Sequence, residues 1–578
     1  MCNTTGNSNS VEQPNKAIGS TKAERAAFLT TQTPLFSVMN LFRFQPLNCL
    51  SMKVTERQLA YPGVSQVAWF GQRVAYLPLG SGGRHLEAAQ LEPYRQIGDP
   101  AMDSLMDFLH KHGHTLKAED DLLNPQVAYP PHVQKRIDDF LAYYSKLPDW
   151  CDIQQIERGQ RVFLKYIGAI SVALLHKSLI PGFSIPKIAQ VICATAYLAP
   201  PSTRESVQQR LMDTGALIAA CFGYGAKPLL AGGEAWKTTL YVRILHSKVR
   251  RALLRRTGSR AWDTKELGVP INQEDLAATA LAFSCNSILG VEFVGGFEVP
   301  KEDKEDYLAL WRYIGWLLGV HTVSEDGVGI PGLTSTNVPS SQSSEFLRSI
   351  DPCGPGWLQD FPDPFQHSRT CLESIILHLC HPNEISVKVS HHLLHSIGPN
   401  RAIDRAKKEI PKSTAPAKTT TLSATSKDNR NDKTPKFGFY ARAAACRAMI
   451  GDPLADALEL PAHPALWGRL TIRLRLFLVW WVLRAYTWIS FVPIVNTWFF
   501  HFHARTLRRF YDVWKEVHEK KLTERLVKTT GTTTETKRTM TMTTTNENKT
   551  TSDTGADARS EKTTVRVCPF ALVAEPIH

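Results

Sequence analysis

Two stretches of this chain determine how its fold is read: Gln209-Arg-Leu-Met-Asp-Thr-Gly215 and Tyr241-Val-Arg-Ile-Leu-His-Ser-Lys-Val-Arg250. In the first stretch, Arg210 and Thr214 are four residues apart. Residues with this spacing lie above one another on one face of an α-helix. We therefore expect a helix there that presents a guanidinium and a hydroxyl on the same side.

The second stretch places a histidine between two arginines on one helical stripe. Arg243, His246 and Arg250 recur at i, i+3 and i+7, which is the period of a helix face. An imidazole can bind iron, and guanidinium groups on the same face can meet the carboxylates of a haem. A lone histidine on an apolar helix is more often a core residue, so the arginines in register carry this interpretation.

The order of these motifs resembles the family of rubber oxygenases (latex-clearing proteins) and the ER-bound oxygenase of fungal mycophenolic-acid biosynthesis. That family carries Arg-x-x-x-Thr, followed by a helix with Val-Arg-(Leu/Ile)-Leu-His-x-x-x-Arg. The resemblance extends over Tyr129 to Val320 and is weaker from Phe437 to about Pro464. No single motif is specific, and the match rests on their order and spacing.

The resemblance implies a mainly α fold whose helical domain binds haem b. His246 is then the ligand of the haem iron, Arg243 and Arg250 are cofactor-binding residues, and Arg210 and Thr214 are catalytic groups over the iron. The implied activity is a haem-dependent oxygenase that uses dioxygen to cleave or oxidise a carbon–carbon double bond. The implied substrate is an apolar, isoprenoid-like or lipid chain, since such a bond has no polar handle and suits an apolar pocket.

One residue departs from the rubber-cleaving pattern. Some of those members carry a lysine directly before the threonine, and this chain has Asp213 there. The glutamate that they use as a base also has no clear counterpart. These departures keep open an alternative, a non-catalytic membrane-associated helical protein that retains the oxygenase scaffold.

Hydrophobic periodicity and breaker residues divide the chain into helices and linkers. The expected helices are His132–Leu147, Gly159–Ser178, Ile185–Leu198, Thr203–Cys221, Trp236–Leu254, Gln273–Leu289 and Lys301–Val320, with a strand or helix at Val64–Leu79. Composition then gives the domains: 1–50, a disordered N-terminal tail; 51–400, the oxygenase-like helical domain; 401–436, a disordered linker; 437–526, a membrane-associated helical segment; 527–578, a Thr-rich disordered tail.

Leu476–Phe500 is apolar and long enough to span a membrane. Arg484 lies inside it, where an unpaired charge costs about 2.5–3.5 kcal/mol by insertion scales. Arginines flank both ends, so the positive-inside rule gives no orientation. A buried helix pair and a re-entrant anchor are the other readings. The tryptophans favour membrane association, because indoles concentrate at membrane interfaces.

Charge and cysteine usage bound the partners and the compartment. The net charge is +13, which favours anionic surfaces, but no nucleic-acid-binding module is visible. The 11 cysteines are scattered without a Cys-x-x-Cys pair, which is typical of free thiols facing a reducing compartment. Together with the resemblance, this predicts a membrane-associated protein of the endoplasmic reticulum whose catalytic domain faces the cytosol.

Overall fold

The computed structural model describes residues 65–69, 72–76, 85–116, 122–123, 127–223, 225–320, 364–397, 437–492 and 494–517. The tails and the linker that the sequence predicts to be disordered, 1–50, 401–436 and 527–578, lie outside these residues.

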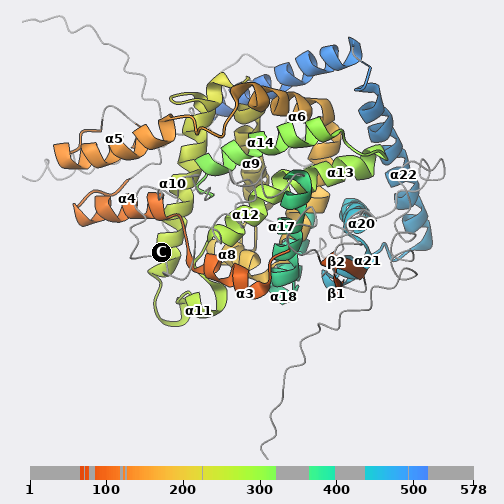
Figure 1. The fold of residues 1–578 in the computed structure, drawn as a ribbon. Helices are drawn as coiled ribbons and strands as arrows, with labels where there is room; N and C mark the ends of the chain where they lie inside the picture. Colours follow the sequence, from red (N-terminus) through yellow and green to blue (C-terminus); the bar gives the residue numbers. More distant parts are fainter. Residues whose placement is uncertain are drawn as a thin grey trace, which may run out of the picture.

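Within the described residues the fold is mainly α-helical, as predicted, with one β-hairpin (Figure 1). Strand β1 (Ser65–Trp69) pairs antiparallel with β2 (Gln72–Tyr76). The helices are α3 (Ala88–Leu91), α4 (Pro100–Lys111), α5 (Pro131–Ser145), α6 (Ile153–Ala173), the π-helix η3 (Leu174–Leu179), α7 (Ile180–Gly182), α8 (Pro186–Thr195), α9 (Arg204–Phe222), α10 (Glu234–Leu254), α11 (Thr264–Leu267), α12 (Gln273–Phe283), α13 (Cys285–Gly295), α14 (Lys301–Leu317), α17 (Pro364–Leu379), α18 (Glu384–Ser396), α20 (Phe437–Ile450), α21 (Asp452–Ala457) and α22 (Leu466–Ile489).

Side-chain caps set several of the helix starts, at the predicted positions for α9 and α12 but six residues before the predicted Gly159 for α6. The Asp152 carboxylate accepts from the backbone N–H of Gln154 at the start of α6, and the Thr203 hydroxyl accepts from that of Ser206 at the start of α9. Asn272 caps α12 in the same way. Each cap satisfies an N–H group that has no partner inside its helix.

The predicted helix Gln273–Leu289 is interrupted, and this prediction was wrong in that detail. The backbone leaves helical geometry at Ser284, with φ −95° and ψ −89°, so that α12 and α13 are separate helices. The carbonyl of Ala282 at the break accepts from the hydroxyls of Ser178 and Ser287, at 2.9 and 3.2 Å. Tertiary hydroxyl donors therefore replace the lost helical hydrogen bonds, which sequence periodicity does not reveal.

The core is built around α6, which packs on α14, α13 and α22. Two glycines permit the closest approaches. A Cβ at Gly159 would overlap the backbone oxygen of Asp306 on α14, and one at Gly290 on α13 would overlap the Cβ of Ala173. The crossing at Ala173 is also the point where α6 gives way to η3.

The C-terminal part of the chain is docked on this core. In Figure 1, α22 and the helix that follows it, Ile494–Val517, form the blue edge at the right and top of the molecule. The buried Arg484 guanidinium donates to the carbonyls of Val294 and Phe293, at 2.8 and 3.3 Å. The indole of Trp488 donates to the carbonyl of Gly295 at 2.7 Å. Two side chains of α22 thus cap the C-terminus of α13, where unpaired carbonyls favour a cation.

By length and composition alone, two helical stretches of the described chain could cross a membrane, Ile153–Gly182 and Gln273–Gly295. Their most apolar windows are 50% and 78% buried inside the fold. Two sharply bent pairs, one of which is α22 with Ile494–Val517, raise the number to four if each pair counts as one span.

The close crossing at Gly290 can be tested by adding one methyl group. We expect Gly290→Ala to lower the free energy of unfolding by about 1–3 kcal/mol, because the packed core must move to admit it. Gly182→Ala is the matched control, since its new Cβ meets nothing within 4 Å. Urea unfolding followed by circular dichroism measures both. Equal stability of the two variants would contradict the crossing.

Candidate functional site

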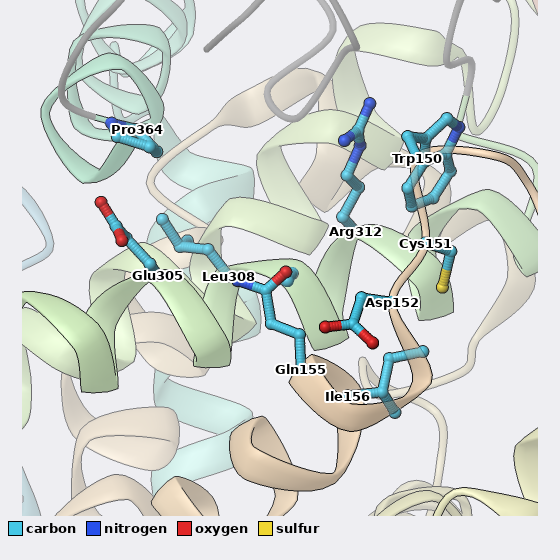
Figure 2. Close-up of a pocket in the computed structure, with 10 residues that line it drawn as sticks. Trp150, Cys151, Asp152, Gln155, Ile156, Glu305, Leu308, Arg312 and Pro364 are labelled. Atoms are coloured by element: carbon cyan, nitrogen blue, oxygen red, sulfur yellow. The ribbon is translucent and has the colours of Figure 1, made fainter.

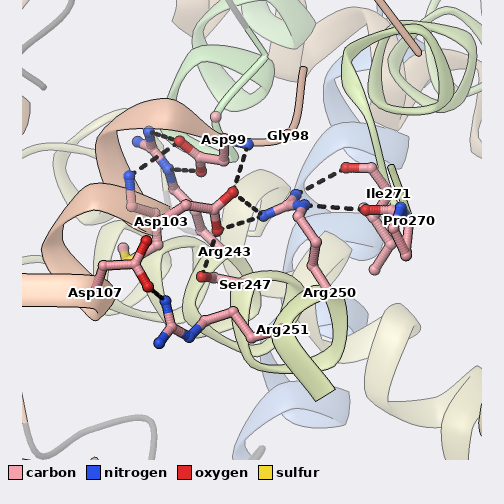
Figure 3. Close-up of polar contacts among 12 residues, drawn as sticks. Gly98, Asp99, Asp103, Asp107, Arg243, Ser247, Arg250, Arg251, Pro270 and Ile271 are labelled. Carbon is pink, nitrogen blue, oxygen red and sulfur yellow. Dashed lines mark hydrogen bonds and ion pairs between the residues drawn. The ribbon is translucent and has the colours of Figure 1, made fainter. Parts of the chain in front are cut away.

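The predicted histidine stripe lies on α10, which packs against α9 and α4. Arg243 and Arg250 are almost completely buried, with side chains 2% exposed in each case. Both side chains face α4. They donate hydrogen bonds to the carboxylates of Asp99, the N-cap of α4, and of Asp103, one turn later (Figure 3).

Asp99 binds Arg243 in a two-point contact. The Arg243 Nε donates to Oδ2 of Asp99, and its Nη2 donates to Oδ1 at 2.8 Å. The same Nη2 donates to the Tyr144 hydroxyl at 2.7 Å, and the guanidinium lies 4.2 Å from the centre of that ring. Nη1 of Arg243 is buried without a hydrogen-bond partner in the described part of the chain. Arg243 therefore keeps one donor for another acceptor.

Asp103 accepts hydrogen bonds from Arg250 and from Ser247. The Arg250 Nη1 donates to both oxygens of Asp103, at 2.6 and 2.9 Å, and the Ser247 hydroxyl donates to Oδ1 at 2.6 Å. The remaining Arg250 nitrogens donate to the carbonyls of Pro270 and Ile271, at 3.0 and 2.8 Å (Figure 3). All three guanidinium nitrogens of Arg250 are thus engaged by the protein itself.

Electrostatics favour the charged form of Arg243. Burial by itself lowers the pKa of Arg243, but the Asp99 and Tyr144 side chains more than offset it, and the net pKa is raised. Burial, opposed by Arg243, raises the pKa of Tyr144 to about 12, so its hydroxyl stays protonated at neutral pH. Arg243 therefore stays charged in its contact with Asp99, and these contacts with α4 form a clamp between α4 and α10.

His246 lies between the two clamped arginines, and its imidazole is half-buried. Burial, with a smaller contribution from Arg250 and against the opposing effect of Asp99, lowers its pKa to about 4. Its Nδ1 is enclosed and makes no hydrogen bond to any described residue. The imidazole is thus neutral at pH 7, which is the form that binds a metal.

Arg210 and Thr214 share a face of α9, as predicted. The Arg210 guanidinium lies over the Tyr197 ring, 3.9 Å from its centre. Its Nε and Nη1 are buried without a partner among the described residues. The Thr214 hydroxyl donates to the Arg210 carbonyl at 3.1 Å, which leaves its oxygen lone pairs to accept.

Asp213 is held by other parts of the protein. Its Oδ1 accepts from the Gln209 amide at 2.9 Å and from the Trp514 indole at 3.0 Å. The carboxylate is only 5% exposed. Asp213 therefore connects α9 to the Ile494–Val517 helix.

Further hydrophobic side chains of this part of the chain are packed on the core but only partly buried. They lie on η3, α8, α9 and α10 and include Leu175, Leu179, Ile188, Ile192, Leu211, Leu217, Ile218 and Val242. Gln190 on α8 adds a buried amide oxygen with no hydrogen-bond partner within the described chain. Sequence reasoning missed Gln190, because an isolated glutamine carries no motif.

Two cavities lie away from His246. The first, about 90 Å³, lies between the start of α6 and α14 and is lined by Trp150, Asp152, Gln155 and Arg312 among others (Figure 2). It has room for a few water molecules. Burial raises the pKa of the adjoining Cys151 thiol to about 12 and keeps it protonated. The second, about 210 Å³, lies between α4 and the last turns of α10.

Sequence reasoning also missed the carboxylates on α4. Three aspartates recur every four residues along α4 and form ion pairs with arginines of α10: Asp99 with Arg243, Asp103 with Arg250, and Asp107 with Arg251. The spacing of Asp99-Pro100-x-x-Asp103, an N-cap followed by proline, was the available signal. Among the described residues, no group of three or more His, Cys, Asp or Glu side chains is placed to hold a metal ion.

Comparison with known proteins bears on this segment directly. Residues 193–326 match the family model described as ER-bound oxygenase mpaB/B′/rubber oxygenase, catalytic domain. The expected family resemblance is confirmed. The matched segment contains all five predicted site residues, on α9 and α10.

Solved structures and curated proteins give two further comparisons. A solved structure of latex clearing protein LCP in the closed state is 15% identical, with a TM-score of 0.41, and the alignment covers 71% of this chain and 93% of that one. No curated protein matches the chain.

The clamp predicts a large difference between two aspartates of α4. We expect Asp99→Ala to lower the free energy of unfolding by about 3–5 kcal/mol, because it leaves the buried Arg243 charge uncompensated. Asp107→Ala is the control: its carboxylate is 70% exposed, and an exposed pair contributes about 0–1 kcal/mol. Denaturant unfolding of both variants measures the difference. Similar losses would contradict a clamp centred on Arg243.

A second buried imidazole makes stability depend on pH. Burial lowers the pKa of His176 to about 4, although its bond to the Val172 carbonyl opposes the shift. As the pH is lowered, the unfolded chain takes up this proton at a higher pH than the folded protein does. The group therefore leaves the free energy of unfolding unchanged above about pH 6.5 and lowers it progressively between pH 6.5 and 4. We expect His176→Gln to reduce that fall by about 1–2 kcal/mol. Urea midpoints from pH 7.5 to 4.5 measure it, and an unchanged slope would contradict the prediction.

Proposed function

We propose that this protein is a haem-b-dependent oxygenase, which uses dioxygen to cleave or oxidise a carbon–carbon double bond in an apolar, isoprenoid-like or lipid chain. The observation that carries the proposal is the family match, because it spans the two helices that bear the predicted site. The family is described as an oxygenase catalytic domain. The substrate class and the cofactor go beyond that description and rest on the following arguments.

The residues present fit a noncovalent haem. His246 offers a neutral imidazole, because burial opposes the uptake of a second proton by the ring. The partly buried hydrophobic side chains on η3, α8, α9 and α10 offer apolar contacts of the kind that a porphyrin and an apolar substrate require. Arg210 and Arg243 each keep buried N–H groups without a partner in the described structure. An unpaired buried donor is costly, and its presence supports a missing acceptor.

The two arginines beside His246 then take different roles. Arg243 still has Nη1 for a cofactor carboxylate, whereas all three nitrogens of Arg250 are occupied by Asp103, Pro270 and Ile271. We therefore assign Arg250 to positioning α10, and Arg243 to both positioning and cofactor binding. His246 would hold the haem iron through its imidazole, on the stretch of α10 that Arg243 and Arg250 fix at either side.

A haem held in this way would supply the oxidative chemistry with dioxygen. Arg210 would donate hydrogen bonds from its unpaired N–H groups to negative charge that develops on the reacting atoms. Beside it, the Thr214 oxygen would accept a hydrogen bond and so orient the donor. The apolar side chains would exclude water and align the substrate chain. Asp213 would act as a contact between helices, because its Oδ1 accepts from Gln209 and from Trp514.

The proposed location is the endoplasmic reticulum membrane, with the catalytic domain on the cytosolic side. The family description includes an ER-bound oxygenase. The described cysteines are free thiols, which agrees with a reducing compartment. The proposed domain organisation assigns residues 51–400 to the oxygenase-like domain and 437–526 to the membrane-associated segment.

The absorption spectrum tests the cofactor and its ligand. We expect the purified full-length protein to show a Soret band, and His246→Ala to lose it or shift it, because the axial bond holds a noncovalent haem. His176→Ala is the matched control, since burial also lowers the pKa of its imidazole to about 4. Wild-type protein without a Soret band after haem addition would favour the non-catalytic alternative. A normal spectrum in His246→Ala would remove His246 as the ligand.

Turnover tests the groups on α9. We expect Arg210→Ala and Thr214→Ala each to lower the rate about a hundredfold while haem content stays near normal, because they act on the reacting atoms and not on the iron bond. Thr279→Ala is the control: its hydroxyl makes the same bond to a carbonyl four residues earlier, but on α12. Oxygen consumption with a panel of prenylated lipids measures the rate. Unchanged rates would place both residues outside the site.

A further inference from the structure

The outer face of the C-terminal helix pair is apolar and open to solvent. On α22 and the Ile494–Val517 helix, Val482 is 68% exposed, Trp498 60% and Ile494 84%. Other exposed members of this face are Leu474, Leu478, Val479, Ile489, Phe491, Val492 and Phe502. A contiguous exposed apolar surface of this kind marks a site of contact with a membrane or another protein. We call it the apolar apex.

Arginines lie on both sides of the apolar apex. Arg469, Arg473 and Arg475 are exposed on the first turns of α22, and Arg505 and Arg509 are exposed on the second helix, beyond the apex. The exposed arginines thus lie towards both outer ends of the helix pair, where they are interspersed with further exposed apolar residues such as Trp467 and Val513. Arginine side chains at the edge of an apolar surface can reach lipid phosphates while the centre is buried in acyl chains.

The bend between the two helices decides how such a segment meets a bilayer. The helix axes turn by 113° between Ile489 and Ile494, at the upper right corner of Figure 1. A segment that crossed the bilayer would place its two arginine groups in opposite headgroup layers. After this turn, both groups can lie in the same layer, with the apex directed into the acyl chains.

The opposite side of α22 is already occupied by protein. Arg484 is 2% exposed and caps the carbonyls at the end of α13. Trp480 and Thr487 are buried on the same side. α22 therefore has one face on the catalytic core and one face free, which is the geometry of a helix in the membrane interface and not of a helix surrounded by lipid.

The second helix of the pair contacts α9, which carries Arg210 and Thr214. Trp514 donates to Asp213 at 3.0 Å, Arg508 donates to the carbonyl of Gly223, and Lys515 pairs with Glu234 at 3.0 Å at the start of α10. The apolar apex is thus connected to the candidate site through one rigid helix.

We propose that the apolar apex enters one leaflet of an anionic phospholipid bilayer without crossing it, and that this docking holds the candidate site against the leaflet that contains its apolar substrate. The inference deepens the membrane location given under the proposed function and rests on it. A second copy of the chain fits this surface less well, because it would bring arginines of equal charge together. Lipid phosphates neutralise them instead.

Vesicle flotation of the full-length protein tests the docking. We expect binding to phosphatidylcholine vesicles that contain phosphatidylserine, and at least tenfold weaker binding for Val482→Glu/Ile494→Glu, since both side chains are exposed and the fold tolerates their change. Leu254→Glu is the matched control, an exposed apolar residue, 43% accessible, on α10. Arg469→Glu/Arg473→Glu is expected to lose about fivefold or more for each arginine. Equal binding of the wild type and the apex variants would overturn the proposal.

Labelling distinguishes an apex in one leaflet from a span. We introduce Arg469→Cys or Arg505→Cys, bind each protein to sealed vesicles from outside and add a membrane-impermeant maleimide, with the parent protein as background. We expect both positions to react. Reaction of only one position would show a span and overturn the proposal, as would a dimer in solution that the apex variants convert to monomer.

The Soret band of the same variants separates this inference from the proposed function. We expect the apex variants to keep the wild-type spectrum. Vesicle binding by a wild-type protein without haem would leave the docking intact and remove the oxygenase proposal. A normal Soret band without vesicle binding would overturn the docking and leave the oxygenase proposal intact.

Discussion

The buried pair of Arg243 with Asp99 is the interaction on which the candidate site depends. It fixes α10 to the N-terminus of α4, and the Tyr144 hydroxyl of α5 accepts a further hydrogen bond from the guanidinium. A buried charge without a partner is costly, so the helices can dock only in the register that joins these groups. Arg250 and Asp103 repeat the contact two turns further along α10. His246, between the two pairs, has little freedom to move along or around the helix axis.

The buried polar atoms without hydrogen-bond partners are informative because the charged side chains around them are paired. Most buried polar groups in folded proteins have hydrogen-bond partners. Here His246 Nδ1, Arg243 Nη1, two Arg210 nitrogens and the Gln190 oxygen have none within the described residues, although Arg243 also pairs with Asp99 and all three guanidinium nitrogens of Arg250 are engaged. These exceptions fall on the helices of the family match, α9 and α10, and on α8, whose last residues lie within it. They are therefore the atoms on which we base a bound cofactor and its reacting partner.

The same logic joins the catalytic helices to the C-terminal pair. Asp213 does not stand free over the site, because the Trp514 indole occupies it from outside α9. Arg484, which costs energy in a membrane span, instead stabilises the C-terminus of α13. Both residues look like departures from their patterns in sequence and prove to be contacts between the core and the helices that carry the apolar apex. The apex is thus joined to the site by helices that pack on one another.

The sequence by itself determined the helices and the stripes on them. The spacing of Arg210 with Thr214, and of Arg243 with His246 and Arg250, follows from helix periodicity and is local. Because each interaction joins residues far apart in the chain, the sequence could not determine that Arg243 pairs with Asp99, that Ser284 breaks a helix whose freed carbonyl at Ala282 is satisfied by Ser178, or that Arg484 caps α13. Local propensity gives a helix and its faces. Which face meets which partner is decided only when the charges and carbonyls of distant helices must be satisfied together in the core.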